Sequence, residues 1–186
     1  MAKCISTKEN DKWDYYYDAM EYLDAGDDKE AKGLLEKAIK VDEDFVAGYI
    51  GMVGVYKSRR NNKKVEEYTN LAFEKTKKKF PKWPKEMRWD VLENRQYLRA
   101  ICGKAILSHE NKNIKEAEEL YHLLLKLNQN DNQGVRYLLA ALYAGEHPRI
   151  ADELMDEGNR LQDWNKLGKF LEDQNKKYKF WDYPNF

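Results

Sequence analysis

Small side chains recur along this chain at a nearly constant interval. Ala31, Val65, Ala117 and Ala151 are separated by 34, 52 and 34 residues. A period of about 34 residues, with each unit long enough for two amphipathic helices, is typical of stacked helical hairpins. The spacing therefore predicts an all-α chain in which each unit buries its apolar face against the next.

The residues that follow these positions keep a common pattern. Ala31 is followed by Leu35 and Ala38, and the same spacing of small and apolar residues begins again at Ala117. Residues at i, i+4 and i+7 lie on one face of a helix. A small first residue lets a neighbouring helix approach closely, so we expect tightly packed helix pairs.

In these features the chain resembles the tetratricopeptide repeat (TPR) family, whose unit is a pair of antiparallel helices with small residues at its eighth, twentieth and twenty-seventh positions. The resemblance implies a right-handed superhelical array, a TPR-like α-solenoid, with an insert before the third repeat and a C-terminal capping helix. In this register the repeats are 12–45, 46–79, 98–131 and 132–165, the insert is 80–97, and the flanking segments are 1–11 and 166–186.

The same resemblance implies a binding site. In the family, the first helix of each unit lines a concave groove, and its second, fifth, ninth and twelfth positions face a bound peptide. The groove residues expected from those positions are Tyr16, Met20, Leu23, Ile50, Lys57, Arg99, Cys102, Ile106, His109, Arg136 and Tyr143. Such a face suits a protein or peptide partner with apolar anchors and acidic groups. A core role is the alternative for Met20, Leu23 and Ile106.

Composition narrows the function classes. The 33 basic and 33 acidic residues cancel, which argues against a general attraction to nucleic acid or to an anionic membrane. The apolar runs are far shorter than the roughly 20 residues that a membrane span needs, and the first ten residues lack a signal-peptide core. The two cysteines, Cys4 and Cys102, do not suggest a disulfide framework, so we expect a cytoplasmic protein.

The sequence shows no pattern for catalysis or metal binding. His109, His122 and His147 are 13 and 25 residues apart, and neither interval places two ligands on one helical turn. No glycine-rich loop that could cradle a phosphate group is present. We therefore expect a protein that is not an enzyme and that has no cofactor.

The insert breaks the period and has a chemistry of its own. Cations alternate with aromatic residues over 77–89, as they do in nucleic-acid grooves, which makes a nucleic-acid-associated accessory protein the alternative function. The simpler interpretation is a basic linker whose tryptophans fold back under lysine stems. Because no helix breaker occurs between Pro84 and Gly103, we expect one long helix to begin near Lys85.

Aromatic residues also gather at the C-terminus. A helix is expected near Trp164–Lys177, because the last unit of an array leaves an apolar face that needs a cap. The segment Tyr178–Phe186 then either packs along the array, including its own groove, or docks on another protein. Exposed aromatic ends leave a self-associating structural protein as a third hypothesis.

Asparagine and aspartate are frequent between the third and fourth expected repeats. Over 127–138 they are expected to cap the helix that follows. This stretch also resembles one found in uncharacterised bacterial TPR proteins, which implies a bacterial origin but no activity.

Overall fold

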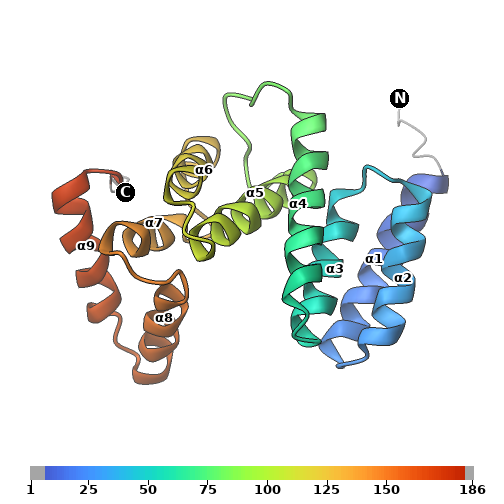
Figure 1. The fold of residues 1–186 in the computed structure, drawn as a ribbon, viewed down its shortest axis with the longest axis horizontal. Coiled ribbons are helices and arrows are strands. Elements are labelled where there is room, and N and C mark those ends of the chain that lie inside the picture. Colours follow the sequence, from blue (N-terminus) through green and yellow to red (C-terminus); the bar gives the residue numbers. More distant parts are fainter. Residues whose placement is uncertain (1–6, 183–186) are drawn as a thin grey trace. The chain divides into compact units, whose positions relative to one another are not determined.

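The computed structural model describes residues 7–182, with side chains from residue 11 onward. Every regular element in this range is a helix, so the all-α class is confirmed. Between residues 7 and 182, no helix is both long and apolar enough to cross a membrane. The helices, labelled in Figure 1, are α1 (Thr7–Asp24), α2 (Asp28–Val41), α3 (Val46–Ser58), α4 (Asn62–Lys79), α5 (Leu92–Glu110), α6 (Ile114–Leu127), α7 (Val135–Ala144), α8 (Arg149–Leu161) and α9 (Asn165–Tyr178).

The chain divides into two compact units. Unit 1 holds the chain up to Trp83 together with Arg95–Ala100, and unit 2 holds Pro84–Asn94 and the chain from Ile101 onward. Helix α5 is continuous, and its residues 95–100 belong to unit 1 while the rest belong to unit 2.

Unit 1 is built from two helix pairs in which α3 approaches its neighbours closely. Helix α1 packs against α2, α3 against α4, and α2 against α3 (Figure 1). A Cβ atom on Gly51 would lie 2.5 Å from a methyl carbon of Leu35, and one on Gly48 would lie 2.8 Å from Cγ1 of Ile39. Because Leu35 is fully buried, it cannot swing into solvent. Glycine at these positions therefore allows the close contact between α2 and α3.

Unit 2 continues the pattern of neighbouring helices in contact. Helix α6 packs against α7, and α9 packs against both α7 and α8. The last part of α5 joins α6 through the hydroxyl of Ser108, which donates to Glu116 at 2.6 Å. The largest fully buried side chains of this unit include Met87, Ile101, Tyr121, Leu124, Leu127, Leu139 and Leu171.

One turn recurs inside successive helix pairs. Gly26, Arg60 and Lys112 have positive φ angles of 80°, 54° and 62°. They are separated by 34 and 52 residues, as are the small residues Ala31, Val65 and Ala117 that follow each of them. In all three turns, the residue with the positive φ donates its amide to the carbonyl three residues before it. The residue after it donates its amide to the carbonyl five residues before its own position, and all these bonds are 2.8–3.0 Å long. These are the hydrogen bonds of a helix C-terminal cap.

The fourth pair closes its first helix in the same way. Gly145 has a φ of 73°, and the same two amide hydrogen bonds form at this glycine and at Glu146. The small residue Ala151 follows one position later than in the other pairs.

The turn between pairs also recurs. Three amide-to-carbonyl bonds connect α2 to α3, and three equivalent bonds lie 86 residues later, between α6 and α7. The matching bonds are Asp42 to Ala38, Phe45 to Asp42 and Gly48 to Phe45 in the first turn, and Asn128 to Leu124, Asp131 to Asn128 and Gly134 to Asp131 in the second.

The expectation of one long helix from Lys85 was wrong, because α5 begins at Leu92. Residues 84–91 form an irregular segment in which Met87 is 2% exposed. The amide of Met87 donates to the carbonyl of Leu127 at 2.7 Å. This amide is therefore satisfied by a contact within unit 2, which replaces the local hydrogen bond that a helix would provide.

Candidate functional site

Six of the expected groove residues lie in unit 1, on α1, α3 and α5: Tyr16, Met20, Leu23, Ile50, Lys57 and Arg99. Met20 and Leu23 are half-buried and lie 3.1 and 3.5 Å from where Cβ atoms would stand on Gly51 and Gly54. Ile50 is also half-buried and packs against a cluster around Val46. Their side chains fill the contacts between helices of unit 1.

Tyr16 and Arg99 are brought together although they are far apart in the sequence. Tyr16 is 8% exposed; burial raises the pKa of its hydroxyl, and the charge and hydrogen bonding of Arg99 lower it. Its ring meets those of Trp13 and Phe45 edge-on, with centroids 5.7 and 6.0 Å away. Arg99 and Lys57 are both exposed. Unit 1 therefore presents Arg99 beside a buried aromatic cluster and an exposed Lys57 in the last turn of α3. We call Tyr16, Lys57 and Arg99 the unit 1 face.

The other five expected groove residues lie in unit 2, and two of them are buried. Cys102 and His109 are 9% and 3% exposed, so their side chains are not presented to a ligand. Ile106 is half-buried. The other cysteine, Cys4, lies outside the described residues.

His109 is held inside unit 2 by both ring nitrogens. Nε2 lies 3.0 Å from the carbonyl oxygen of Glu146, so it must carry the hydrogen and donate it. Nδ1 then accepts from the hydroxyl of Tyr121 at 3.4 Å. Burial lowers the pKa of His109, although the bond to Glu146 acts in the opposite direction. The neutral ring thus connects α5 to α6 and to the loop before α8.

Arg136, in the first turn of α7, is fixed by a buried carboxylate. Asp131 accepts from the amides of Val135 and Arg136 at 2.6 and 3.0 Å, and from the guanidinium of Arg136 at 2.9 Å. Burial raises the pKa of the Asp131 carboxyl, while these donors lower it. The guanidinium carbon lies 4.5 Å from the ring centroid of Tyr137 and 5.3 Å from that of Trp181. Arg136 therefore offers a flat cationic surface whose orientation is set by Asp131.

Tyr143, at the other end of α7, is fixed by two side chains of α6. Its hydroxyl donates to Glu118 at 2.6 Å and accepts from Nε2 of His122 at 3.0 Å. Burial raises the pKa of this hydroxyl, and the bond to Glu118 adds to the effect. The ring stacks on that of Tyr178 at a centroid distance of 4.2 Å and an interplanar angle of 10°. We call Arg136 and Tyr143 the α7 face.

Sequence reasoning assigned no site role to the side chains that hold the α7 face. Glu118 and His122 are four residues apart, and this spacing puts both on one face of a helix, which is the signal that could have identified them. Asp131 was expected as a helix cap, a role that its bonds to the first amides of α7 confirm. No local pattern distinguishes Trp181.

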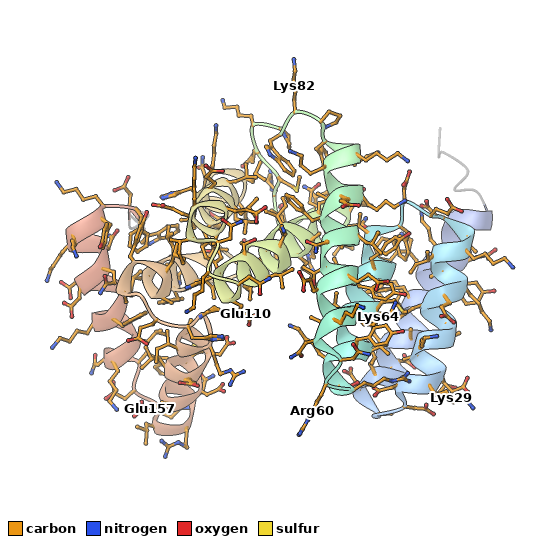
Figure 2. The ribbon with its side chains drawn as sticks, in the orientation of Figure 1. Lys29, Arg60, Lys64, Lys82, Glu110 and Glu157 are labelled. Atoms are coloured by element: carbon orange, nitrogen blue, oxygen red, sulfur yellow. The ribbon has the colours of Figure 1, made fainter. Side chains whose placement is uncertain are left out.

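The basic aromatic segment 77–89 makes many of its contacts within the chain. The ring of Trp83 lies 6.5 Å from that of Phe80, and Nζ of Lys77 lies 5.7 Å from the Trp83 ring. Arg88 is in an ion pair with the aspartate two residues later. Lys82 points away from the ribbon at the tip of the loop (Figure 2). The segment therefore combines an aromatic cluster with exposed lysines.

Two further observations bear on function. Within the part of the chain that the structure describes, no group of three His, Cys, Asp or Glu side chains could hold a metal ion. Comparisons with protein-family models, curated proteins and solved structures found no match. Function is therefore inferred from the geometry of the unit 1 face and the α7 face.

Proposed function

We propose that this protein is a non-enzymatic interaction module of the TPR type, which binds a peptide or helix of a partner protein through the first helices of its pairs. The observation that carries the proposal is the turn that recurs at Gly26, Arg60 and Lys112 with the same hydrogen bonds and the same intervals as the small residues. Supersecondary units that recur in this way are the building blocks of repeat arrays. A right-handed superhelix of these pairs belongs to the same proposal.

The unit 1 face determines the partner chemistry that we propose. Arg99 and Lys57 are exposed cations, and the aromatic cluster around Tyr16 lies beside Arg99. A cation next to aromatic surface favours a partner segment that combines acidic groups with apolar anchors. We therefore propose an acidic, partly apolar peptide as the ligand of unit 1.

A nucleic-acid role for 77–89 has less support. Stacking of bases needs exposed faces of aromatic rings. The ring of Trp83 is half-buried and is in contact with Phe73, Phe80 and Lys77. Its packing supports the interpretation of this segment as a structural linker.

Selection of displayed random peptides on the full-length protein tests the proposal. We expect enriched peptides that carry acidic and apolar residues, and a loss of at least about tenfold in affinity, equal to about 1.4 kcal/mol, in the Arg99→Glu variant. Lys29→Glu is the matched control, because it makes the same charge change at an exposed position on α2, the second helix of its pair (Figure 2).

The proposal fails if no peptide is enriched, or if Lys29→Glu weakens binding as much as Arg99→Glu. Circular dichroism of both variants shows that they are folded. Binding that responds only to Arg99 locates the ligand on the unit 1 face.

A further inference from the structure

Four lysines gather at the end of α4. Lys77, Lys78 and Lys79 lie in the last turn of the helix, and Lys82 follows in the loop, where it points away from the ribbon (Figure 2). All four side chains are exposed, and all four belong to unit 1. We call these four residues the α4 basic end. Because the residues of the unit 1 face lie on α1, α3 and α5, the α4 basic end is a separate feature of unit 1.

One carboxylate neutralises a part of this positive charge. Asp44, in the turn before α3, accepts from Nζ of Lys78 at 2.6 Å and from Nζ of Lys75 at 3.0 Å. The hydrogen bonds from Lys78 and Lys75 lower the pKa of the Asp44 carboxyl. Asp44 is therefore ionised at neutral pH, but its single negative charge is shared by two lysines.

The other three lysines of the α4 basic end have no carboxylate partner. Within residues 11–182, Lys77, Lys79 and Lys82 form no ion pair, and Nζ of Lys77 lies over the ring of Trp83. The C-terminal end of a helix carries about half of a negative charge, which favours cations in the last turn. This amount offsets only a part of three cations. A chain with as many acidic as basic residues thus concentrates positive charge at one place.

The arrangement of the lysines indicates which anion fits. Successive residues of a helix lie about 100° apart around its axis, so Lys77, Lys78 and Lys79 point to three different sides of the helix end. A straight, rigid nucleic-acid duplex would meet only one of these sides, whereas a flexible acidic peptide can wrap around them. Single-stranded nucleic acid needs exposed ring faces for its bases, and the ring of Trp83 is half-buried. Charge and shape together favour a flexible segment rich in Asp and Glu.

We propose that the α4 basic end is a docking surface for a flexible acidic segment of a partner protein. This site goes beyond the proposed function, which places a ligand with apolar anchors on the first helices of the pairs. Contacts between exposed charges weaken as salt is added, and they act mainly on the rate of association. The α4 basic end therefore captures its acidic partner quickly and holds it weakly.

A labelled peptide of ten glutamates is the probe. It is titrated into the full-length protein, and fluorescence anisotropy reports the Kd at about 20 and 200 mM salt, where exposed charges are screened to different degrees. We expect binding at the lower salt concentration and a Kd at least about tenfold higher at the other. A peptide of ten glutamines, which carries no charge on its side chains, should not bind at either concentration.

Two variants with opposite expected effects locate the binding. Lys79→Gln/Lys82→Gln removes two cations that have no partner in the chain, and should weaken binding of the glutamate peptide about fivefold. Asp44→Asn removes the carboxylate that competes for Lys75 and Lys78, and should strengthen binding about threefold. A gain in affinity cannot result from a substitution that merely disturbs folding.

A third variant is the matched control. Lys29→Gln/Lys63→Gln makes the same change of charge at two exposed lysines of unit 1 that lie outside the α4 basic end. The Kd of this variant should stay within about twofold of the wild-type value, because exposed charges at a distance are screened. Circular dichroism of all three variants shows that they are folded.

The proposal is overturned if the glutamate peptide does not bind, if the control weakens binding as much as Lys79→Gln/Lys82→Gln, or if Asp44→Asn does not strengthen it. It is also overturned if another anion binds more tightly than the peptide and is lost in Lys79→Gln/Lys82→Gln. The anions to compare are a single-stranded RNA of ten nucleotides and vesicles of equal parts phosphatidylcholine and phosphatidylserine. None of these outcomes involves Arg99, so failure of this proposal is distinct from failure of the proposed function.

Discussion

Units 1 and 2 use the same type of helix pair but stabilise it differently. Unit 1 relies on close apolar contact, with α3 glycines facing Leu35 and Ile39 and an aromatic cluster around Tyr16. Unit 2 contains side-chain networks that connect helices, such as those centred on His109 and Tyr143. The turns inside the pairs are nonetheless alike. The repeating backbone therefore tolerates two different ways of joining helices.

The largest predicted difference between the units comes from their capping aspartates. Asp131→Ala removes a buried carboxylate that caps α7 and binds Arg136, and should lower the free energy of unfolding by about 3 kcal/mol. Asp27→Ala removes a single exposed cap bond to the amide of Glu30, and should cost about 1 kcal/mol. Urea denaturation followed by circular dichroism measures both. Equal losses would show that the Asp131 network adds nothing beyond capping.

Close packing in unit 1 is tested by two glycine substitutions. Gly51→Ala places a Cβ atom 2.5 Å from buried Leu35, and overpacking of this kind should destabilise the protein by about 2 kcal/mol. Gly33→Ala is the control, because nothing lies within 4 Å of its Cβ position in α2. At Gly33, the better helix propensity of alanine should stabilise the protein by about 0.5–1 kcal/mol. If Gly51→Ala leaves the free energy of unfolding unchanged, α2 and α3 can move apart freely.

The recurring turn predicts opposite effects in the two units. Gly26→Ala puts a side chain at a φ of 80° and should cost about 1 kcal/mol, although nothing lies within 4 Å of the new Cβ. Lys112→Gly relieves the same backbone strain at a φ of 62° in unit 2, and should raise the free energy of unfolding by about 0.5 kcal/mol. Thermal unfolding compares the two variants. If both changes have the same sign, the two turns are not energetically equivalent.

The smallest expected effect is a dependence of stability on pH that originates in unit 2. Because burial lowers the pKa of His109 in the folded protein, the unfolded chain binds a proton first as the pH falls through the ordinary histidine value of 6.5. The contribution of the neutral ring is therefore complete above pH 6.5 and declines below it. His109→Gln should reduce this decline between pH 7.5 and 5.5, whereas His122→Gln, at an exposed position, should retain it. Denaturation at several pH values measures the slopes.

Local sequence pattern predicted much of the fold and less of the site. The small residues and their intervals predicted an all-helical chain, and a helix follows Trp164 as expected. The turns at Arg60 and Lys112 could not be recognised, because neither position carries the glycine that marks a positive φ at Gly26. Their conformation becomes visible only through the hydrogen bonds that they share.

The errors and omissions arise from contacts between distant residues. The start of α5 depends on a bond from Met87 to Leu127, forty residues away, which no helix propensity reveals. The burial of His109 depends on Tyr121 and on the loop at Glu146. The sequence could not show whether the segment after α9 packs on its own chain or docks on another protein, because its packing depends on contacts of Trp181 with Arg136 and Asn175. Residues 183–186, the remainder of that expected segment, lie outside the described residues.

The most direct test of the central claim is a map of backbone amide chemical shifts in the full-length protein, recorded with and without a peptide obtained by selection. The proposed function predicts that the largest shifts fall on the first helices of the pairs, α1, α3 and the residues of α5 around Arg99. Shifts concentrated on α2 and α4, or confined to 77–89, would contradict it.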